Sequence, residues 1–457
     1  MTYQVIITLA RNLLTEDGVI FISIDDNEIH NLRKICDEVF GDENFVTQLI
    51  WERAYSPKND AKYISNSHDY VLMYSKSIDI FKIGRLPRTE EANARYQNPD
   101  NDPRGVWKPS DMSVKTYNAE CDYSITTPTG RVIEPPTGRC WRLSKKAFLE
   151  RLKDNRIYFG ADGNSVPCIK RFLTELKFDG MAPQSIMFYK DVGHSQEGAQ
   201  EVTKLLDSGA FDGPKPVRLL RRLLTLANTE KDSIILDFFS GSATTAHAVM
   251  QLNAEDEGNR KFIMVQLPEE TDSKSEAYKA GYKNICEIGK ERIRRAGKKI
   301  EEELKAKSKE GELFKDEERK PLDTGFRVLK VDSTNMKDVY YSPSQYNQQM
   351  LLELESNIKE DRTDIDLLYG VLLDWGVPLS LPHITEKIGG KDVHFVNDTD
   401  LVACFEEHVP EDVIREIANR KPLRVVFRDS SFRSSPDKIN VTEIFKTLSP
   451  ETTIKVI

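Results

Sequence analysis

Hydrophobic residues in the first thirty positions change from helical spacing to strand spacing. Residues 3–14 carry apolar side chains at helical intervals, and Gly18 is expected to close the helix that they predict. Three of these side chains share one helical face: Val5, Leu9 and Leu13. Residues 19–24 form an almost continuous apolar run, which is typical of a strand covered on both faces. The chain is therefore predicted to begin with a helix and a buried strand.

A second helix and a pair of strands are predicted next. The acidic cluster at residues 25–28 suits the N-cap of a helix that runs to Phe40, and Gly41 is expected to end it. Residues 46–51 and 70–74 are rich in β-formers, and they are predicted to form an antiparallel pair at the sheet edge.

The most informative segment is residues 234–249. An apolar strand leads into Asp237, then into a turn of small residues, Ser240 to Ala243, and then into a helix that Thr244 opens. Small residues allow a backbone to approach a ligand closely, and a helix start offers unpaired N–H groups. Because ligands of open α/β sheets bind at the carboxyl ends of strands, the pattern predicts a nucleotide-type cofactor site.

The segments around this turn are similar to those of a known enzyme family. Residues 213–224 precede it, residues 261–269 and 285–296 follow it, and Phe239 to Ala243 correspond to a Phe-x-Gly-x-Gly motif. In order and spacing they resemble DNA amino-methyltransferases whose target-recognition segment precedes the cofactor motif. The resemblance is closer still to the modification (Mod) subunit of Type III restriction-modification systems. Ala243 replaces the second glycine, which is tolerable if that residue has helical φ.

The resemblance implies S-adenosyl-L-methionine as cofactor and names its contacts. Asp237, Phe239, Ser240, Gly241 and Ser242 match the motif around the methionine portion, with Thr244 at the helix start; Lys215 and Pro216 match the Lys-Pro beside the cofactor. Gln266 or Glu269 is expected to bind the ribose hydroxyls, although a solvated or capping role for Glu269 is equally open. No metal site is expected.

The catalytic motif of the family is absent from the sequence. The resemblance implies adenine-N6 methylation, for which the family uses Asp-Pro-Pro-Tyr to hold the flipped base, and this motif would lie before Met1. Glu134-Pro-Pro-Thr137 is interpreted as a loop, while Asp25 and Asp26 are expected to cap a helix rather than serve the pocket. No catalytic residue is therefore expected in the chain, which is interpreted as an N-terminally truncated Mod subunit.

Loss of that segment would also remove the central strand of the sheet. The strands at 19–24 and 234–238 would then expose unpaired edges or pair with each other. Two alternatives remain: a non-catalytic remnant that binds cofactor and DNA, and cytosine-N4 methylation, whose deciding motif, Ser-Pro-Pro-Tyr, would also lie outside the chain.

Charge is unevenly distributed along the 457 residues. The whole chain carries −9, whereas residues 82–190 hold 19 Lys and Arg against 13 Asp and Glu. Aromatic residues alternate with cations in this basic segment, which suits contact with double-stranded DNA. The expected organisation is a first methyltransferase part at 1–81, a target-recognition domain at 82–210, the cofactor-binding part at 211–320 and an α+β domain at 321–457.

The last domain is predicted from new hydrophobic runs after Pro321. Strands are expected at 326–332 and 421–429, with the terminal residues 454–457 added to the sheet, and helices at 348–357, 363–373 and near 441–448. The resemblance implies that this domain serves Mod homodimerisation and docking of the restriction (Res) subunit.

Cysteine usage and hydropathy indicate the compartment. The six cysteines show no C-x-x-C spacing, which fits reduced cytoplasmic thiols. No apolar stretch is long enough for a membrane span and no signal peptide is evident, so no membrane partner is expected. The expected fold is α/β, with a Rossmann-like methyltransferase sheet that lacks its central strand.

Overall fold

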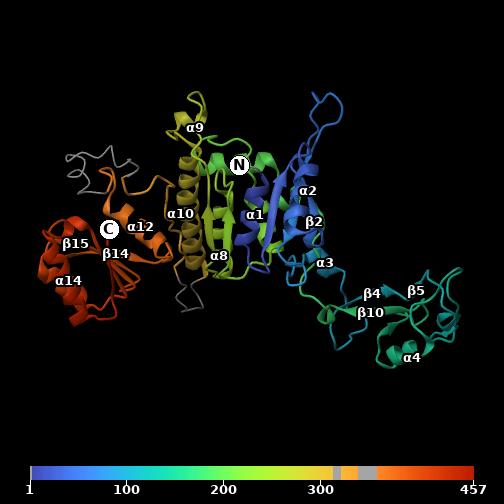
Figure 1. Cartoon of the computed structure of the whole chain (residues 1–457). Coiled ribbons are helices and arrows are strands. Elements are labelled where there is room, and N and C mark those ends of the chain that lie inside the picture. The colour runs from blue at the N-terminus through green and yellow to red at the C-terminus, as the bar shows by residue number, and fades with distance from the viewer. Residues whose placement is uncertain (1–2, 312–320, 338–357) are drawn as a thin grey trace. The chain divides into compact units, whose positions relative to one another are not determined.

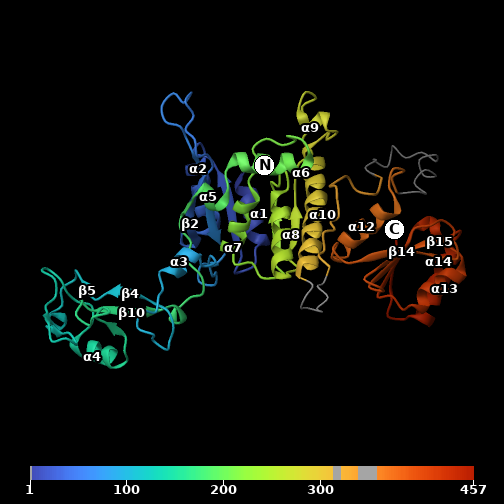
Figure 2. The same ribbon diagram turned by 180° about the vertical axis from the view of Figure 1, so that it is seen from behind.

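The computed structural model describes residues 3–311, 321–337 and 358–457, and these divide into two compact units with a boundary between Phe326 and Arg327 (Figures 1 and 2). Both units combine helices with open sheets, which confirms the predicted α/β class. The predicted helix at 348–357 lies outside the described residues.

The first sheet has the order β1-β3-β2-β11. Its strands are β1 (Val19–Ile24), β2 (Phe45–Glu52), β3 (His68–Ser75) and β11 (Ile186–Met187). The predicted antiparallel pairing of β2 with β3 is confirmed, but neither strand is at the sheet edge, because β3 also pairs with β1 and β2 pairs in parallel with β11.

Helices cover both faces of this sheet. On one face α1 (Tyr3–Leu13) and α2 (Ile29–Phe40) bury Ile7 and Leu32 against Leu72 and Tyr74. On the other face α7 (Val217–Leu226) and the short α5 (Tyr189–Val192) pack against Leu49, Trp51 and Val71. The Trp51 indole also donates to the Gly193 carbonyl oxygen at 2.9 Å, which ties β2 to the end of α5.

Two local expectations for this region differ from the structure. The helix face of Val5, Leu9 and Leu13 is exposed, at 45%, 55% and 71%, and β1 is mostly half-buried instead of covered on both faces. The predicted N-cap role of Asp25 and Asp26 is wrong. The N-cap of α2 is Glu28, which makes no side-chain cap bond, and the Asp25 carboxylate accepts the Asn27 N–H instead. A local turn therefore outcompetes helix capping.

The cofactor-binding part forms a second, two-stranded parallel sheet. Strands β12 (Ile234–Asp237) and β13 (Lys261–Met264) pair with each other, and in the described chain neither pairs with β1. Each of β1 and β12 thus keeps one unpaired edge within the described residues, as predicted.

Helices of this part cluster around α8 (Thr244–Asp256), which packs against α7 and against α10 (Ile285–Gly311) (Figures 1 and 2). The other helices are α6 (Ser195–Leu206), which contacts α10, and α9 (Glu276–Lys279). Within the described part of the chain, no helix combines the length and the apolar character needed to cross a membrane.

Residues 82–185 are built from short strands around a small core. β4 (Trp107–Asp111), β10 (Cys168–Phe172) and β9 (Ile157–Tyr158) form an antiparallel sheet. Two further pairs are β5 (Ser113–Val114) with β8 (Cys140–Trp141) and β6 (Ile125–Thr126) with β7 (Val132–Ile133); the helices are α3 (Glu90–Ala94) and α4 (Lys145–Lys153). Glu134-Pro-Pro-Thr137 is a loop after β7, as predicted.

The second unit contains a five-stranded mixed sheet. Its strands in spatial order are β14 (His383–Ile388), β15 (Lys391–Val396), β16 (Leu401–Cys404), β17 (Arg424–Phe427) and β18 (Thr453–Val456). The packed helices are α12 (Asp364–Asp374), α13 (Glu411–Asn419) and α14 (Ser435–Leu448). Strands β17 and β18 and helices α12 and α14 match the predictions, whereas β14, β15, β16 and α13 were not predicted and residues 326–332 form no strand. Val328, Leu329 and Val331 are exposed there, and within the described residues no strand pairs with them.

Candidate cofactor-binding site

The turn between β12 and α8 is held by the Asp237 carboxylate at the end of the strand. One carboxylate oxygen accepts the Phe239 N–H at 3.2 Å, and the other accepts the Thr245 hydroxyl at 2.6 Å. One oxygen therefore binds the turn itself and the other binds the first residues of α8. Asp237 fixes the path of the chain from the strand into the helix start.

Gln266, two residues beyond β13, supports the same turn. Its side-chain oxygen accepts the Gly241 N–H at 2.8 Å, and the Ser240 N–H donates to the neighbouring Val265 carbonyl at 3.2 Å. The structure thus brings Gln266 to the predicted turn, whereas the Glu269 side chain is exposed on the segment that follows. A ribose contact of either residue stays a prediction.

The backbone of the turn is left-handed at two positions. Gly241 has φ +50°, and a Cβ there would lie 3.0 Å from the Phe211 ring. Ala243 has φ +60° and ψ +38°, so the helical φ on which tolerance of this alanine depended is not found. A left-handed alanine costs about 1–2 kcal/mol. Its buried methyl, 3.5 Å from the Cβ position of Gly289, offsets part of that cost.

The two adjacent phenylalanines point to different environments. Phe238 packs against the core formed by α1, α2 and the first sheet, whereas the Phe239 ring is 66% exposed beside the turn. Their ring centroids lie 5.2 Å apart. Phe238 thereby ties the turn to the first sheet, and Phe239 presents an aromatic face to solvent.

Lys215 lies near two carboxylates, Asp237 at the end of β12 and Asp69 in β3. Burial lowers the pKa of the Lys215 ammonium, and the charges of Asp69 and Asp237 oppose this change. Burial also disfavours the charged form of Asp69 and therefore raises the pKa of this carboxyl, which is ion-paired with Arg53 at 2.9 Å. Asp69 was not among the predicted site residues, although a charged residue next to a continuous apolar run was a usable signal.

Close helix packing positions the Lys215 segment. Gly198 of α6 faces the Pro214 carbonyl, and a Cβ at this position would lie 2.1 Å from that oxygen. Pro216 is the N-cap residue of α7, and the Val217 N–H that follows donates to the Glu201 carboxylate at 3.0 Å. Lys215 and Pro216 are thus fixed between α6 and α7.

A buried arginine lies beneath the turn. Arg292 of α10 donates from Nη1 to the Ser242 hydroxyl at 2.8 Å and to the Thr244 hydroxyl at 2.7 Å. Ser242 and Thr244 are themselves buried, so these two predicted site residues direct their hydroxyls toward the scaffold. Arg292 was not among the predicted site residues, because it lies in a charge-dense helix about fifty residues away.

Residues 2–298, which include this turn and its scaffold, match a family model described as DNA methylase. The chain belongs to the DNA methylase family. The matched residues contain all of the predicted cofactor contacts.

Curated relatives of this DNA methylase include modification subunits. It is 38% identical over 296 residues to the Type III restriction-modification enzyme StyLTI Mod subunit of Salmonella typhimurium, covering 64% of this chain and 44% of that protein. It is 35% identical over 319 residues to the EcoPI Mod subunit of Escherichia phage P1, covering 64% and 48%. The chain thus spans less than half the length of these relatives.

One solved structure similar to this DNA methylase is a putative DNA modification methylase from Thermus thermophilus, complexed with S-adenosyl-L-methionine. The likeness has 14% identity and a TM-score of 0.28, and it covers 64% of this chain and 75% of the other.

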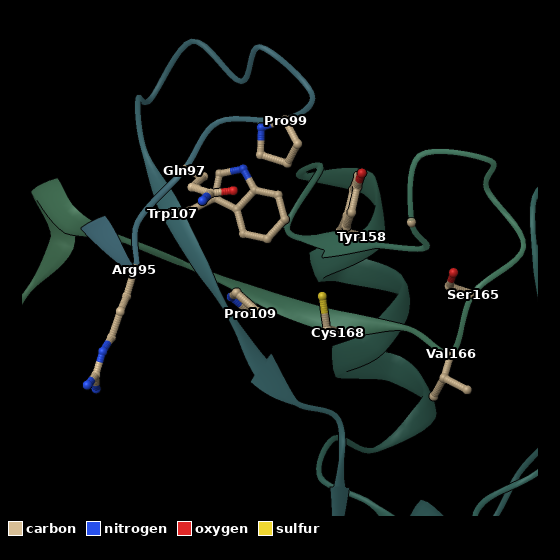
Figure 3. A pocket seen from close by; sticks show the side chains of 10 residues that line it. Arg95, Gln97, Pro99, Trp107, Pro109, Tyr158, Ser165, Val166 and Cys168 are labelled. Carbon is tan, nitrogen blue, oxygen red and sulfur yellow. The ribbon is translucent and has the colours of Figure 1, made fainter. Parts of the chain in front are cut away.

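The segment 82–185 of the DNA methylase contains a separate cavity of about 350 Å³ (Figure 3). Trp107 and Tyr158 contribute aromatic rings whose centroids lie 5.0 Å apart, and Cys168 of β10 also lines the cavity. Below the Trp107 ring, the fully buried Lys170 is ion-paired with Asp100 and Asp102. Hydrogen bonds from Arg104 and Lys170 hold the pKa of Asp102 well below its usual range.

Proposed function

We propose that this DNA methylase uses S-adenosyl-L-methionine to methylate adenine N6 in double-stranded DNA, as part of a Type III modification enzyme. The observation that carries the proposal is the turn at residues 237–244, which is held from both sides by Asp237 and Gln266 and lies beside Lys215. Membership of the DNA methylase family supports the reaction class.

The residues of the turn suit this cofactor in their chemistry. S-adenosyl-L-methionine supplies an activated methyl group together with an amino-acid end and a nucleoside end. Lys215 offers a cation to a ligand carboxylate, Phe239 offers an exposed ring, and the start of α8 offers backbone N–H groups. We propose contacts from these groups and from the remaining residues of the motif: Asp237, Ser240, Gly241, Ser242, Thr244, Pro216, Gln266 and Glu269.

The base clamp is proposed to come from a further polypeptide segment. The sequence contains no Asp-Pro-Pro-Tyr. Within the described residues β1 and β12 each keep an unpaired edge, and Ile234 and Ile263 are 67% and 51% exposed on the small sheet. An extended segment that pairs with these edges would bury the apolar side chains and satisfy the free backbone groups.

We also propose the partners that the Mod resemblance implies. The basic surplus of residues 82–190 supports a target-recognition role on double-stranded DNA. A second copy of the chain and a restriction subunit are proposed to bind the second unit. The absent base clamp favours one alternative, a non-catalytic module that binds cofactor and DNA.

Calorimetric titration of the purified chain with S-adenosyl-L-methionine tests the cofactor proposal. Saturable binding is expected, and Asp237→Ala should weaken it about tenfold or more, because loss of the carboxylate frees the turn. Asp232→Ala, an exposed carboxylate five positions upstream, is the matched control and should bind as the wild type does. Absence of binding by the wild-type chain would overturn the proposed function.

Transfer of tritiated methyl groups to DNA, followed by nucleoside chromatography, tests the reaction. No transfer by the chain alone supports the need for a further segment. N6-methyladenine formed by the chain alone would confirm the transferase and refute that need. N4-methylcytosine would overturn the assigned base.

A further inference from the structure

Arg292 is a completely buried cation at the junction of three helices and the cofactor turn. Its side chain is 0% exposed on α10. Nη1 donates to Ser242 and Thr244, while Nη2 lies 3.8 Å from the Glu201 carboxylate of α6. Nε and Nη2 have no hydrogen-bond partner in the described part of the chain.

This arrangement is unfavourable for stability alone. Moving a guanidinium out of water costs several kcal/mol, and a buried ion pair often stabilises no better than an apolar side chain of similar volume. Burial lowers the pKa of Arg292 to about 10, which leaves it charged at neutral pH. Two hydroxyls and one distant carboxylate compensate the charge only in part, so its location calls for another explanation.

The contacts of Arg292 connect the two halves of the proposed cofactor site. Ser242 and Thr244 belong to the turn after β12. Glu201 accepts the Val217 N–H, directly after the Lys215-Pro216 segment. A single side chain therefore links the turn to the residues that place Lys215.

The surface of α10 is shaped for this contact. Gly289 lies one helical turn before Arg292, and a Cβ there would be 3.4 Å from the Gly241 carbonyl oxygen and 3.5 Å from the Ala243 Cβ. The absence of a side chain at Gly289 allows α10 to approach the turn closely enough for Arg292 to reach both hydroxyls.

We propose that Arg292, with Glu201, is a positioning residue that sets the geometry of the cofactor turn relative to the Lys215 segment. This inference rests on the proposed function, because the geometry that it fixes is that of the S-adenosyl-L-methionine site. The pair is not expected to touch the cofactor.

Calorimetry separates positioning from general stabilisation. Arg292→Met is expected to raise the Kd for S-adenosyl-L-methionine about tenfold or more, since hydrogen bonds to charged groups carry that much energy. The urea midpoint of the ligand-free chain should change little, because the variant removes a costly buried charge and the Glu201 carboxylate left behind is partly exposed and still accepts the Val217 N–H. Arg292→Lys keeps the charge but lacks the planar guanidinium that reaches both hydroxyls, so its affinity should lie between those of Arg292→Met and the wild type.

The matched control is Arg295→Met on the same helix. Arg295 is ion-paired with Glu291 and Asp207 rather than with residues of the turn. The Kd of this variant should equal that of the wild type. A purely structural role of Arg292 predicts instead an unchanged Kd together with a lower urea midpoint, and this result would overturn the proposal.

Hydrogen exchange on the ligand-free chain tests the coupling without the cofactor. Arg292→Met should speed exchange both in residues 239–246 and at the Val217 amide, whereas Arg295→Met should leave both unchanged. Glu201→Gln keeps an acceptor for Val217 but removes the charge, so it should affect residues 239–246 alone. If Arg292→Met leaves both segments at the wild-type rate, the positioning inference fails. If the coupling is found but the wild type binds no cofactor, the proposed function fails instead.

Discussion

Replacing His247 with leucine is expected to make the first unit less sensitive to acid. His247 lies on α8 with 7% of its surface exposed, and its Nδ1 has no hydrogen-bond partner in the described part of the chain. Burial, and next the positive charge of Arg292, lower its pKa to about 3, against 6.5 for an ordinary histidine. The native state therefore keeps His247 neutral, while the unfolded chain takes up a proton as the pH falls below 6.5.

Because of this single group, the free energy of unfolding decreases as the pH is lowered from 6.5 to 3. Each pH unit in that window is worth about 1.36 kcal/mol, so the loss reaches about 2 kcal/mol at pH 5. Above pH 7 the histidine is neutral in both states and contributes no pH dependence. His247→Leu fills a similar volume without titrating, so its stability should fall by about 2 kcal/mol less between pH 7.5 and pH 5.

Urea unfolding at these two pH values measures the effect. A Trp375→Phe background leaves three tryptophans, Trp51, Trp107 and Trp141, which all lie in the first unit and report on it by fluorescence. Met250→Leu, a buried and nearly isosteric change on the same helix, is the control and should shift the stability equally at both pH values. If His247→Leu and the wild type lose the same stability on acidification, the reasoning about the buried imidazole is wrong.

Three further predictions concern other parts of the first unit. Lys170→Met should lower the free energy of unfolding of the 82–185 segment by about 1.5–3 kcal/mol, because the buried Asp102 carboxylate keeps Arg104 but loses its charge-assisted hydrogen bond to Lys170; chemical unfolding followed through Trp107 and Trp141 checks this, and an unchanged midpoint would contradict it. Gly198→Ala should destabilise the chain by about 1–3 kcal/mol, since its methyl would collide with the Pro214 carbonyl; a wild-type melting temperature would show that α6 can move away freely. Gly241→Ala should lower the free energy of unfolding by about 1–2 kcal/mol, because alanine is strained in the left-handed backbone of this position, and it should also weaken cofactor binding. Melting curves should show a lower melting temperature without S-adenosyl-L-methionine and a smaller rise on its addition, and wild-type curves would contradict both expectations.

Local patterns were enough to predict the elements of the cofactor part. The apolar strand, the small-residue turn and the helix start at Thr244 are encoded within about fifteen residues, and the structure has them in that order. In the second unit, α12, α14, β17 and β18 followed from periodicity in the same way.

Features set by distant residues were not predictable from local sequence. The φ of Ala243 depends on the space left by Gly289, and Arg292 is buried only because α6, α8 and the turn surround it. In sequence, Arg292 resembles the solvated charges beside it. The wrongly predicted strand at 326–332 shows the same limit, because a strand needs a neighbour to supply hydrogen bonds.

The order of β11 and α7 in the chain has a consequence for biosynthesis. β1, β2 and β3 have all left the ribosome soon after residue 75 is made, but the strand and helix that complete their sheet end at residues 187 and 226. At a translation rate of about 5–20 residues per second, roughly 8–30 seconds pass between the synthesis of β3 and that of α7, which covers the second face of the sheet. During that interval Leu49 and Val71 are open to other newly made chains, so we expect the yield of folded protein to rise when chaperones are abundant and when translation is not crowded.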